Sequence, residues 1–90
     1  MKTTADVKDK YQSLISTLKR ERDELNVKVH LASMEVRDEW KGVEEKWEHL
    51  QSKGRQLGQA TDESAHELGD AVSILGSELK ETYKRLKRAL

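Results

Sequence analysis

The chain has 90 residues, of which 34% are hydrophobic and 38% are charged, and it contains no phenylalanine. This length allows one small domain, and so little apolar material excludes a large globular core. Because 17 basic residues balance 17 acidic ones, the charge predicts no overall field for nucleic acid or an anionic membrane, and the lack of cysteine excludes disulfides, thiolate metal sites and cysteine nucleophiles.

No apolar run approaches the roughly 18 residues that a membrane span needs, and the N-terminal residues lack the apolar core of a signal peptide. We therefore expect a soluble, cytoplasmic protein. The apolar residues are regularly spaced rather than sparse, which argues against disorder. Their spacing favours long helices that pack along narrow seams.

The first predicted helix covers residues 5–53. Its apolar residues recur in steps of three and four, and no proline interrupts them. The predicted seam and interface residues of this helix are Val7, Tyr11, Leu14, Leu18, Leu25, Val36, Trp40, Val43, Trp47 and Leu50. Val29 and Ala32 continue the same stripe. An alternative is a turn at Asn26, which would give a monomeric bundle of three similar helices; we prefer the continuous helix because neither glycine nor proline supports a turn there.

A turn is predicted at residues 54–60. Gly54 and Gly58 lie four residues apart in a polar stretch, and each weakens a helix by about 1 kcal/mol relative to alanine. Either glycine can adopt the left-handed conformation that ends a helix, and Thr61 can cap the next one. The chain is therefore expected to reverse its direction here.

The second predicted helix covers residues 61–90. Acidic residues gather at its start and basic residues at its end, which complements the helix dipole. Its predicted seam residues are Leu68, Val72, Leu75, Leu79 and Leu86. Together the two helices predict an all-α fold, an antiparallel helical hairpin with coiled-coil packing that forms a single domain over residues 1–90.

Folding at the predicted turn would set Trp47 against Ala65 and Gly69, and Trp40 against Gly76. The two indoles would then fill the space beside small residues of the second helix, as a close-packed interior requires. This complementarity supports the hairpin.

The longer first helix would leave residues 5–22 without a partner inside the chain. They carry several large apolar side chains, and leaving each of these in water forfeits about 1.5–3 kcal/mol. We therefore predict a homo-oligomer, a dimer or tetramer with a four-helix arrangement, in which a second copy covers this end.

Residue types that carry out chemistry are sparse. Glu63 and His66 form one Glu-x-x-His motif, which di-iron bundles use twice, and the second motif is absent. His49 with Glu45 lacks a third metal ligand, and His30 stands alone. We predict no catalytic residue, no metal site, no cofactor and no enzymatic activity.

The end of the second helix is basic. Five of its residues could contact an anionic surface: Lys80, Lys84, Arg85, Lys87 and Arg88. Such an end is typical of binding to anionic lipid, RNA or an acidic partner. It is also expected from complementation of the helix dipole and pairing with acidic residues of a neighbouring helix, and this is the explanation we favour. No specific nucleic acid is predicted.

Four groups of residues carry a family resemblance: Tyr11, Leu14 and Leu18; Glu24, Leu25 and Lys28; Trp40, Trp47, Glu48 and Leu50; and Asp62, Glu63, Ser64 and Ala65 before Leu68 and Leu79. This arrangement resembles small bacterial coiled-coil proteins of a stress-response or apolipoprotein-like type. The resemblance covers most of the chain and rests on seam motifs. It implies a helical hairpin and no established activity.

These features predict a non-enzymatic, self-associating coiled-coil protein with a structural or interaction role, and the resemblance suggests a stress-related one. The alternative function is reversible binding to lipid or another anionic surface, with the amphipathic helices opening their seam onto it.

Overall fold

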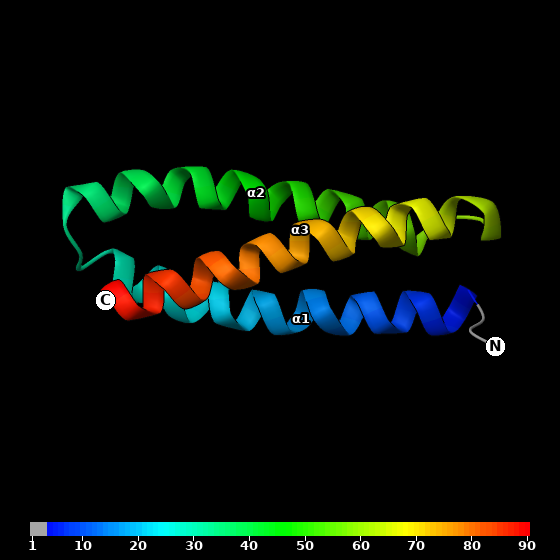
Figure 1. The fold of residues 1–90 in the computed structure, drawn as a ribbon, viewed down its shortest axis with the longest axis horizontal. Helices are drawn as coiled ribbons and strands as arrows, with labels where there is room; N and C mark the ends of the chain where they lie inside the picture. The colour runs from blue at the N-terminus through cyan, green and yellow to red at the C-terminus, as the bar shows by residue number, and fades with distance from the viewer. Residues whose placement is uncertain (1–3) are drawn as a thin grey trace.

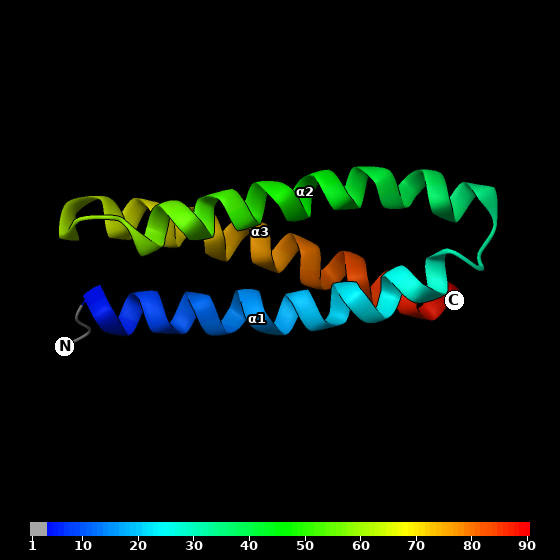
Figure 2. The same ribbon diagram turned by 180° about the vertical axis from the view of Figure 1, so that it is seen from behind.

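The computed structural model describes residues 4–90, which form three helices and no strand. Helix α1 spans Thr4–Val29, α2 spans Met34–Gly58 and α3 spans Asp62–Ala89. Helices α1 and α3 point the same way, and α2 runs antiparallel to both (Figure 1). The bundle measures 46 × 18 × 16 Å, and the opposite view again shows α3 crossing the space between α1 and α2 (Figure 2).

The predicted continuous first helix is wrong, and with it the two-helix hairpin, because the chain turns between Val29 and Met34. The alternative architecture of three similar helices is the one observed, with lengths of 26, 25 and 28 residues, although Asn26 itself stays helical. The physical reason is a helix cap at Ser33. Its backbone is extended (φ −63°, ψ 162°), and its hydroxyl accepts a hydrogen bond from the Val36 N–H at 3.4 Å.

The predicted turn at residues 54–60 is displaced. Helix α2 continues through Gly54 to Gly58, and the turn follows at residues 59–61. No glycine in the described part of the chain has a positive φ, so neither glycine ends the helix as a left-handed cap. Thr61 precedes α3 in an extended conformation, but its side chain makes no capping hydrogen bond.

Gly54 of α2 and Gly69 and Gly76 of α3 serve instead as places where α1 approaches closely. A Cβ built on Gly54 would lie 2.5 Å from Cδ1 of Ile15, and one built on Gly76 would lie 2.9 Å from Cδ2 of Leu14. The large apolar side chains Val7, Tyr11, Leu14, Ile15 and Leu18 therefore pack inside their own chain. The predicted overhang does not exist, and it no longer argues for a second copy.

The predicted contact of Trp40 is also wrong. Trp40 packs on Tyr83, with ring centroids 6.1 Å apart, rather than on Gly76. Because the chain turns at residues 59–61, the antiparallel pairing of α2 with α3 is shifted along the helices. Gly69 and Gly76 of α3 receive side chains of α1, namely Tyr11 and Leu14.

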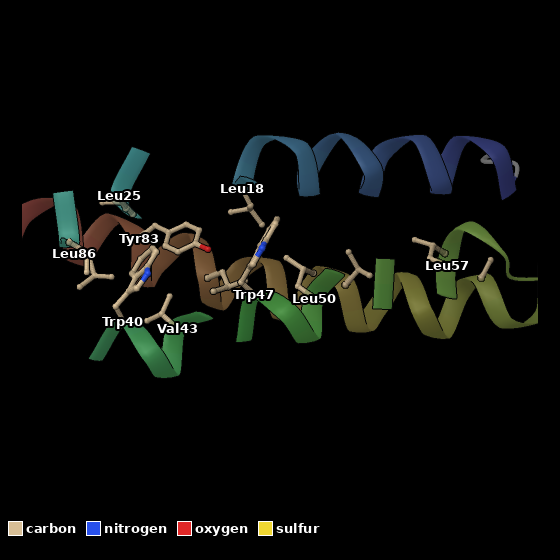
Figure 3. Packing of buried hydrophobic residues seen from close by; sticks show 13 residues of the cluster. Leu18, Leu25, Trp40, Val43, Trp47, Leu50, Leu57, Tyr83 and Leu86 are labelled. Carbon is tan, nitrogen blue, oxygen red and sulfur yellow. The ribbon is translucent and has the colours of Figure 1, made fainter. Parts of the chain in front are cut away.

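All three helices contribute to one continuous hydrophobic core (Figure 3). Its buried members are Leu18, Leu25, Val29, Trp40, Val43, Trp47, Leu50, Leu57, Ala65, Val72, Leu79, Tyr83 and Leu86. Burying this apolar surface against two neighbouring helices is what stabilises each helix, since most helical stability in proteins comes from the packing of an apolar face.

Replacing Gly42 by alanine is expected to stabilise the bundle by about 1 kcal/mol, because an added Cβ meets nothing within 4 Å and alanine favours a helix. Replacing Gly69 by alanine is expected to give no such gain. Its Cβ would lie 2.9 Å from the rigid ring of Tyr11, so α1 must shift. Urea unfolding followed by circular dichroism measures both variants. Equal stabilisation of the two would show that α1 does not pack at Gly69.

Candidate functional site at the basic end of the bundle

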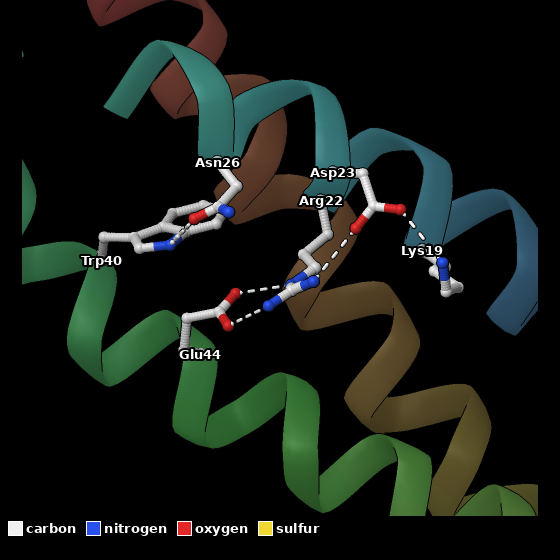
Figure 4. A network of polar contacts seen from close by, with 6 residues as sticks. All are labelled: Lys19, Arg22, Asp23, Asn26, Trp40 and Glu44. Atoms are coloured by element: carbon white, nitrogen blue, oxygen red, sulfur yellow. Dashed lines mark hydrogen bonds and ion pairs between the residues drawn. The ribbon is translucent and has the colours of Figure 1, made fainter. Parts of the chain in front are cut away.

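A polar network joins α1 to α2 (Figure 4). The Arg22 guanidinium donates two hydrogen bonds to the Glu44 carboxylate, at 2.8 and 2.5 Å, and a third to Asp23 at 3.0 Å. These partners, Glu44 first, raise the pKa of Arg22. Hydrogen bonds from Lys19 and then Arg22 lower the pKa of Asp23. The Arg22–Glu44 pair links α1 to α2 and helps to hold these two helices in register.

The same interface contains one neutral polar contact. The Trp40 indole N–H donates to the Asn26 carboxamide oxygen at 3.1 Å (Figure 4). This bond satisfies the polar atom of a buried aromatic ring. Asn26 thus stabilises the packing of α1 on α2 near the turn. It does not break the helix, which was the alternative weighed for this residue.

The three histidines, His30, His49 and His66, are all exposed. Among residues 4–90, no group of three or more His, Cys, Asp and Glu side chains is arranged to hold a metal ion. No helix in this part of the chain combines the length and apolarity that crossing a membrane requires.

Tyr83 is fully buried, and its hydroxyl makes no hydrogen bond to any described residue. Burial, followed by the charge of Glu44, raises the pKa of Tyr83. A buried hydroxyl without a partner loses its hydration and gains nothing in return. The ring stabilises the core, whereas the oxygen costs free energy.

Replacing Tyr83 by phenylalanine is expected to leave the free energy of unfolding unchanged or to raise it by about 1 kcal/mol.

Above about pH 10 the native protein should lose stability, because the unfolded chain ionises Tyr83 before the folded chain does. The variant should lose less over that range. Urea unfolding at about pH 7 and about pH 11 tests both points. A loss of more than about 1 kcal/mol at neutral pH would mean that the hydroxyl has a partner.

Four large apolar side chains are exposed near the end of the bundle where the α1–α2 turn and the C-terminus lie, a backbone arrangement that Figure 1 shows. Val27 is 66% exposed, Leu31 is 90% exposed, Met34 is 73% exposed and Leu90 is 42% exposed. We call these four residues the apolar tip. Exposing several large apolar side chains at one place is uncommon for a protein surface that binds nothing.

Two residues of the apolar tip, Leu31 and Leu90, border a hollow of about 530 Å³ between the turn and the end of α3. Its lining residues are Lys28, Leu31, Ala32, Ser33, Val36, Ala89 and Leu90. Apolar side chains line most of it, and Lys28 places a cation at its edge. The hollow is therefore suited to an apolar group that also carries or neighbours a negative charge.

Basic residues lie in the last turn of α1, the first two turns of α2 and the last two turns of α3, all next to this end of the bundle, and all of them are exposed. This basic rim consists of Lys28, Arg37, Lys41, Lys84, Arg85, Lys87 and Arg88. Lys41, Lys84 and Arg85 pair with Asp38, Glu81 and Glu39 respectively. The other four cations make no ion pair within residues 4–90. The rim therefore has excess positive charge although the whole chain is neutral.

The structure places the predicted seam residues away from water. Nine of them are buried: Leu18, Leu25, Trp40, Val43, Trp47, Leu50, Val72, Leu79 and Leu86. The other six are half-buried: Val7, Tyr11, Leu14, Val36, Leu68 and Leu75. The five predicted anionic-surface contacts are all exposed. Four of them belong to the basic rim: Lys84, Arg85, Lys87 and Arg88. The fifth, Lys80, lies earlier in α3 and farther from the C-terminal end.

Sequence reasoning missed the apolar tip and two large core residues. Val27, Leu31 and Met34 repeat at i, i+4 and i+7, so they form a second stripe outside the seam that could have been recognised. Tyr83 lies between Leu79 and Leu86 at seam spacing, and this spacing is the signal that could have placed it in the core. Leu57 fell in the predicted turn.

Comparisons of this sequence and structure with protein-family models, curated proteins and solved structures find no match. The resemblance to small bacterial coiled-coil proteins and the stress-related role that it suggests therefore remain predictions.

Proposed function

We propose that this protein is a non-enzymatic binding module whose apolar tip and basic rim dock on an anionic lipid surface. The observation that carries the proposal is the exposure of Leu31, at 90%, between the unpaired cations Lys28 and Arg37. Apolar side chains can enter the interface of a bilayer while neighbouring lysines and arginines contact lipid phosphates.

Charge complementarity favours an anionic lipid surface as the partner. Each basic residue near an anionic bilayer contributes about 1 kcal/mol, so the four unpaired cations of the rim supply a substantial attraction. The neutral net charge provides no general attraction, which means that binding must be oriented with this end toward the lipid. Helix α3 begins with acidic residues at the opposite end, and these favour the same orientation.

In this proposal the bundle binds in its closed form. Opening the seam, as apolipoprotein-type helices do, would expose core residues such as Leu50, Leu79 and Tyr83, which are completely buried. The apolar tip is already exposed and needs no rearrangement. The proposed contact therefore differs from the expected alternative in using the end of the bundle rather than its length.

Vesicle flotation tests the proposal. The protein is expected to float with vesicles containing phosphatidylglycerol and to stay behind with pure phosphatidylcholine. The double variant Leu31→Ser/Met34→Ser should bind about tenfold more weakly or worse, because two apolar side chains are lost from the interface. Ile74→Ser is the matched control: Ile74 is 62% exposed but lies in the middle of α3, so binding should not change.

A second pair of variants tests the electrostatic contribution of the basic rim to vesicle binding. Lys87→Ala/Arg88→Ala should weaken binding about tenfold or more at low salt. Lys46→Ala/Arg55→Ala removes two exposed cations outside the rim and should have little effect. Failure to bind anionic vesicles, or equal loss in the two pairs, would contradict docking through this end. Binding of an acidic protein but not of vesicles would point to a protein partner instead.

A further inference from the structure

Apart from the Ser33 cap, the turn between α1 and α2 contains none of the residues that usually force a chain to reverse. Residues 30–33 include neither glycine nor proline, and no residue in the described part of the chain has a positive φ. Helix α1 closes with short-range hydrogen bonds, from Leu31 N–H to Lys28 at 3.1 Å and from Ala32 N–H to Val29 at 3.0 Å. These are the bonds of a tightened last helical turn.

The apolar seam also passes through the turn without a break in its spacing. Leu25, Val29, Ala32, Val36 and Trp40 follow one another in steps of three and four. If residues 30–33 became helical, these side chains would share one face of a single helix. The turn is thus compatible with a straight conformation, and that conformation would satisfy backbone groups that two separate helix ends leave unpaired.

We propose that two copies of this chain can exchange α1. In the exchanged dimer the turn straightens, α1 and α2 merge into one long helix, and α1 of each copy packs on α2 and α3 of the other. Domain exchange of this kind is a low-cost route to a dimer because it keeps the native contacts and changes only the hinge. It also gives a physical basis for self-association that needs no overhang.

The contacts that would be exchanged are specific ones. Ile15 packs on Gly54 and Leu14 packs on Gly76. The same contacts would form whether α1 belongs to the same chain or to the other copy. The ion pair between Arg22 and Glu44 also joins α1 to α2, so it would form between copies. The ion pair between Glu39 and Arg85 joins α2 to α3 and would stay within one chain. This difference allows exchange to be separated from ordinary surface association.

Reciprocal charge reversal tests the proposal. The variants Arg22→Glu and Glu44→Arg each place like charges across the α1–α2 interface. In an exchanged heterodimer, however, each α1 meets an α2 of opposite charge in both halves. Mixing the two variants in urea and refolding them together at high concentration should therefore give a heterodimer, which native mass spectrometry identifies by its mass, in clear excess over either homodimer.

Two controls make the outcome decisive. The variants Glu39→Arg and Arg85→Glu reverse the α2–α3 pair, and their mixture should show no preference for a heterodimer. Adding Met34→Pro to the first pair should abolish the heterodimer, because proline suits the first position of α2 after extended Ser33 but cannot lie inside a continuous helix. No heterodimer from the first pair, or an equal amount from both pairs, would overturn exchange of α1. Neither result bears on lipid binding, which is measured separately.

Discussion

Replacing Leu18 by alanine is expected to lower the free energy of unfolding by about 2–5 kcal/mol, a large part of the stability of a domain this small. Leu18 is 1% exposed and lies in the core between α1 and the other two helices. Removing its branched side chain leaves a cavity that neighbouring groups fill only partly. Urea unfolding monitored by tryptophan fluorescence and circular dichroism measures the loss.

The matched control for this substitution is Leu31→Ala. Leu31 is the same residue type in the same region of the chain but is 90% exposed, so its replacement should change stability by no more than about 0.5 kcal/mol. Similar effects of the two substitutions would mean that α1 does not pack in the bundle as described.

Replacing Trp47 by alanine is expected to cost about 3–5 kcal/mol. Trp47 is buried, and its indole points toward Leu18 in the middle of the bundle (Figure 3). The effect reaches across three helices, since the core there is continuous. Thermal unfolding followed by circular dichroism should show a markedly lower midpoint or an unfolded chain at room temperature.

Trp47→Phe provides the comparison for this position, because it keeps an aromatic ring and should cost less than Trp47→Ala. The substitutions at Leu18 and Trp47 are not expected to be additive, since the two side chains face one another and share one cavity when both are removed. Additive losses would show that the two residues do not share that part of the core.

The helical class of the fold could be predicted from the sequence because its signal is repeated along the chain. Apolar residues at steps of three and four appear in every part of it, and a helix that buries such a stripe is the only regular structure with that period. The position of the break could not be predicted in the same way. It depends on Ser33, one of several serines and threonines in the chain, whose capping role becomes clear only when α1 and α2 are packed together.

The glycines show why local preferences were insufficient. Gly54 and Gly58 each disfavour a helix by about 1 kcal/mol, which predicts a turn when nothing else is known. In the folded chain, packing of Ile15 on Gly54 requires the absence of a side chain there, and this tertiary contact decides the conformation. The placement of the basic residues of α3 could be anticipated, whereas their meeting with Leu31 and Met34 could not, because that depends on where the chain turns.

Small-angle X-ray scattering of the protein, at a dilution where its mass is that of one chain, tests the central claim most directly. A self-contained bundle of three helices predicts a longest dimension near 46 Å and a radius of gyration close to 14.4 Å for the backbone. A single helix over residues 5–53 would by itself be about 73 Å long. A one-chain particle of that length would contradict the three-helix bundle. It would also contradict the proposed binding surface, which requires the α1–α2 turn and the C-terminus to lie at the same end of the bundle.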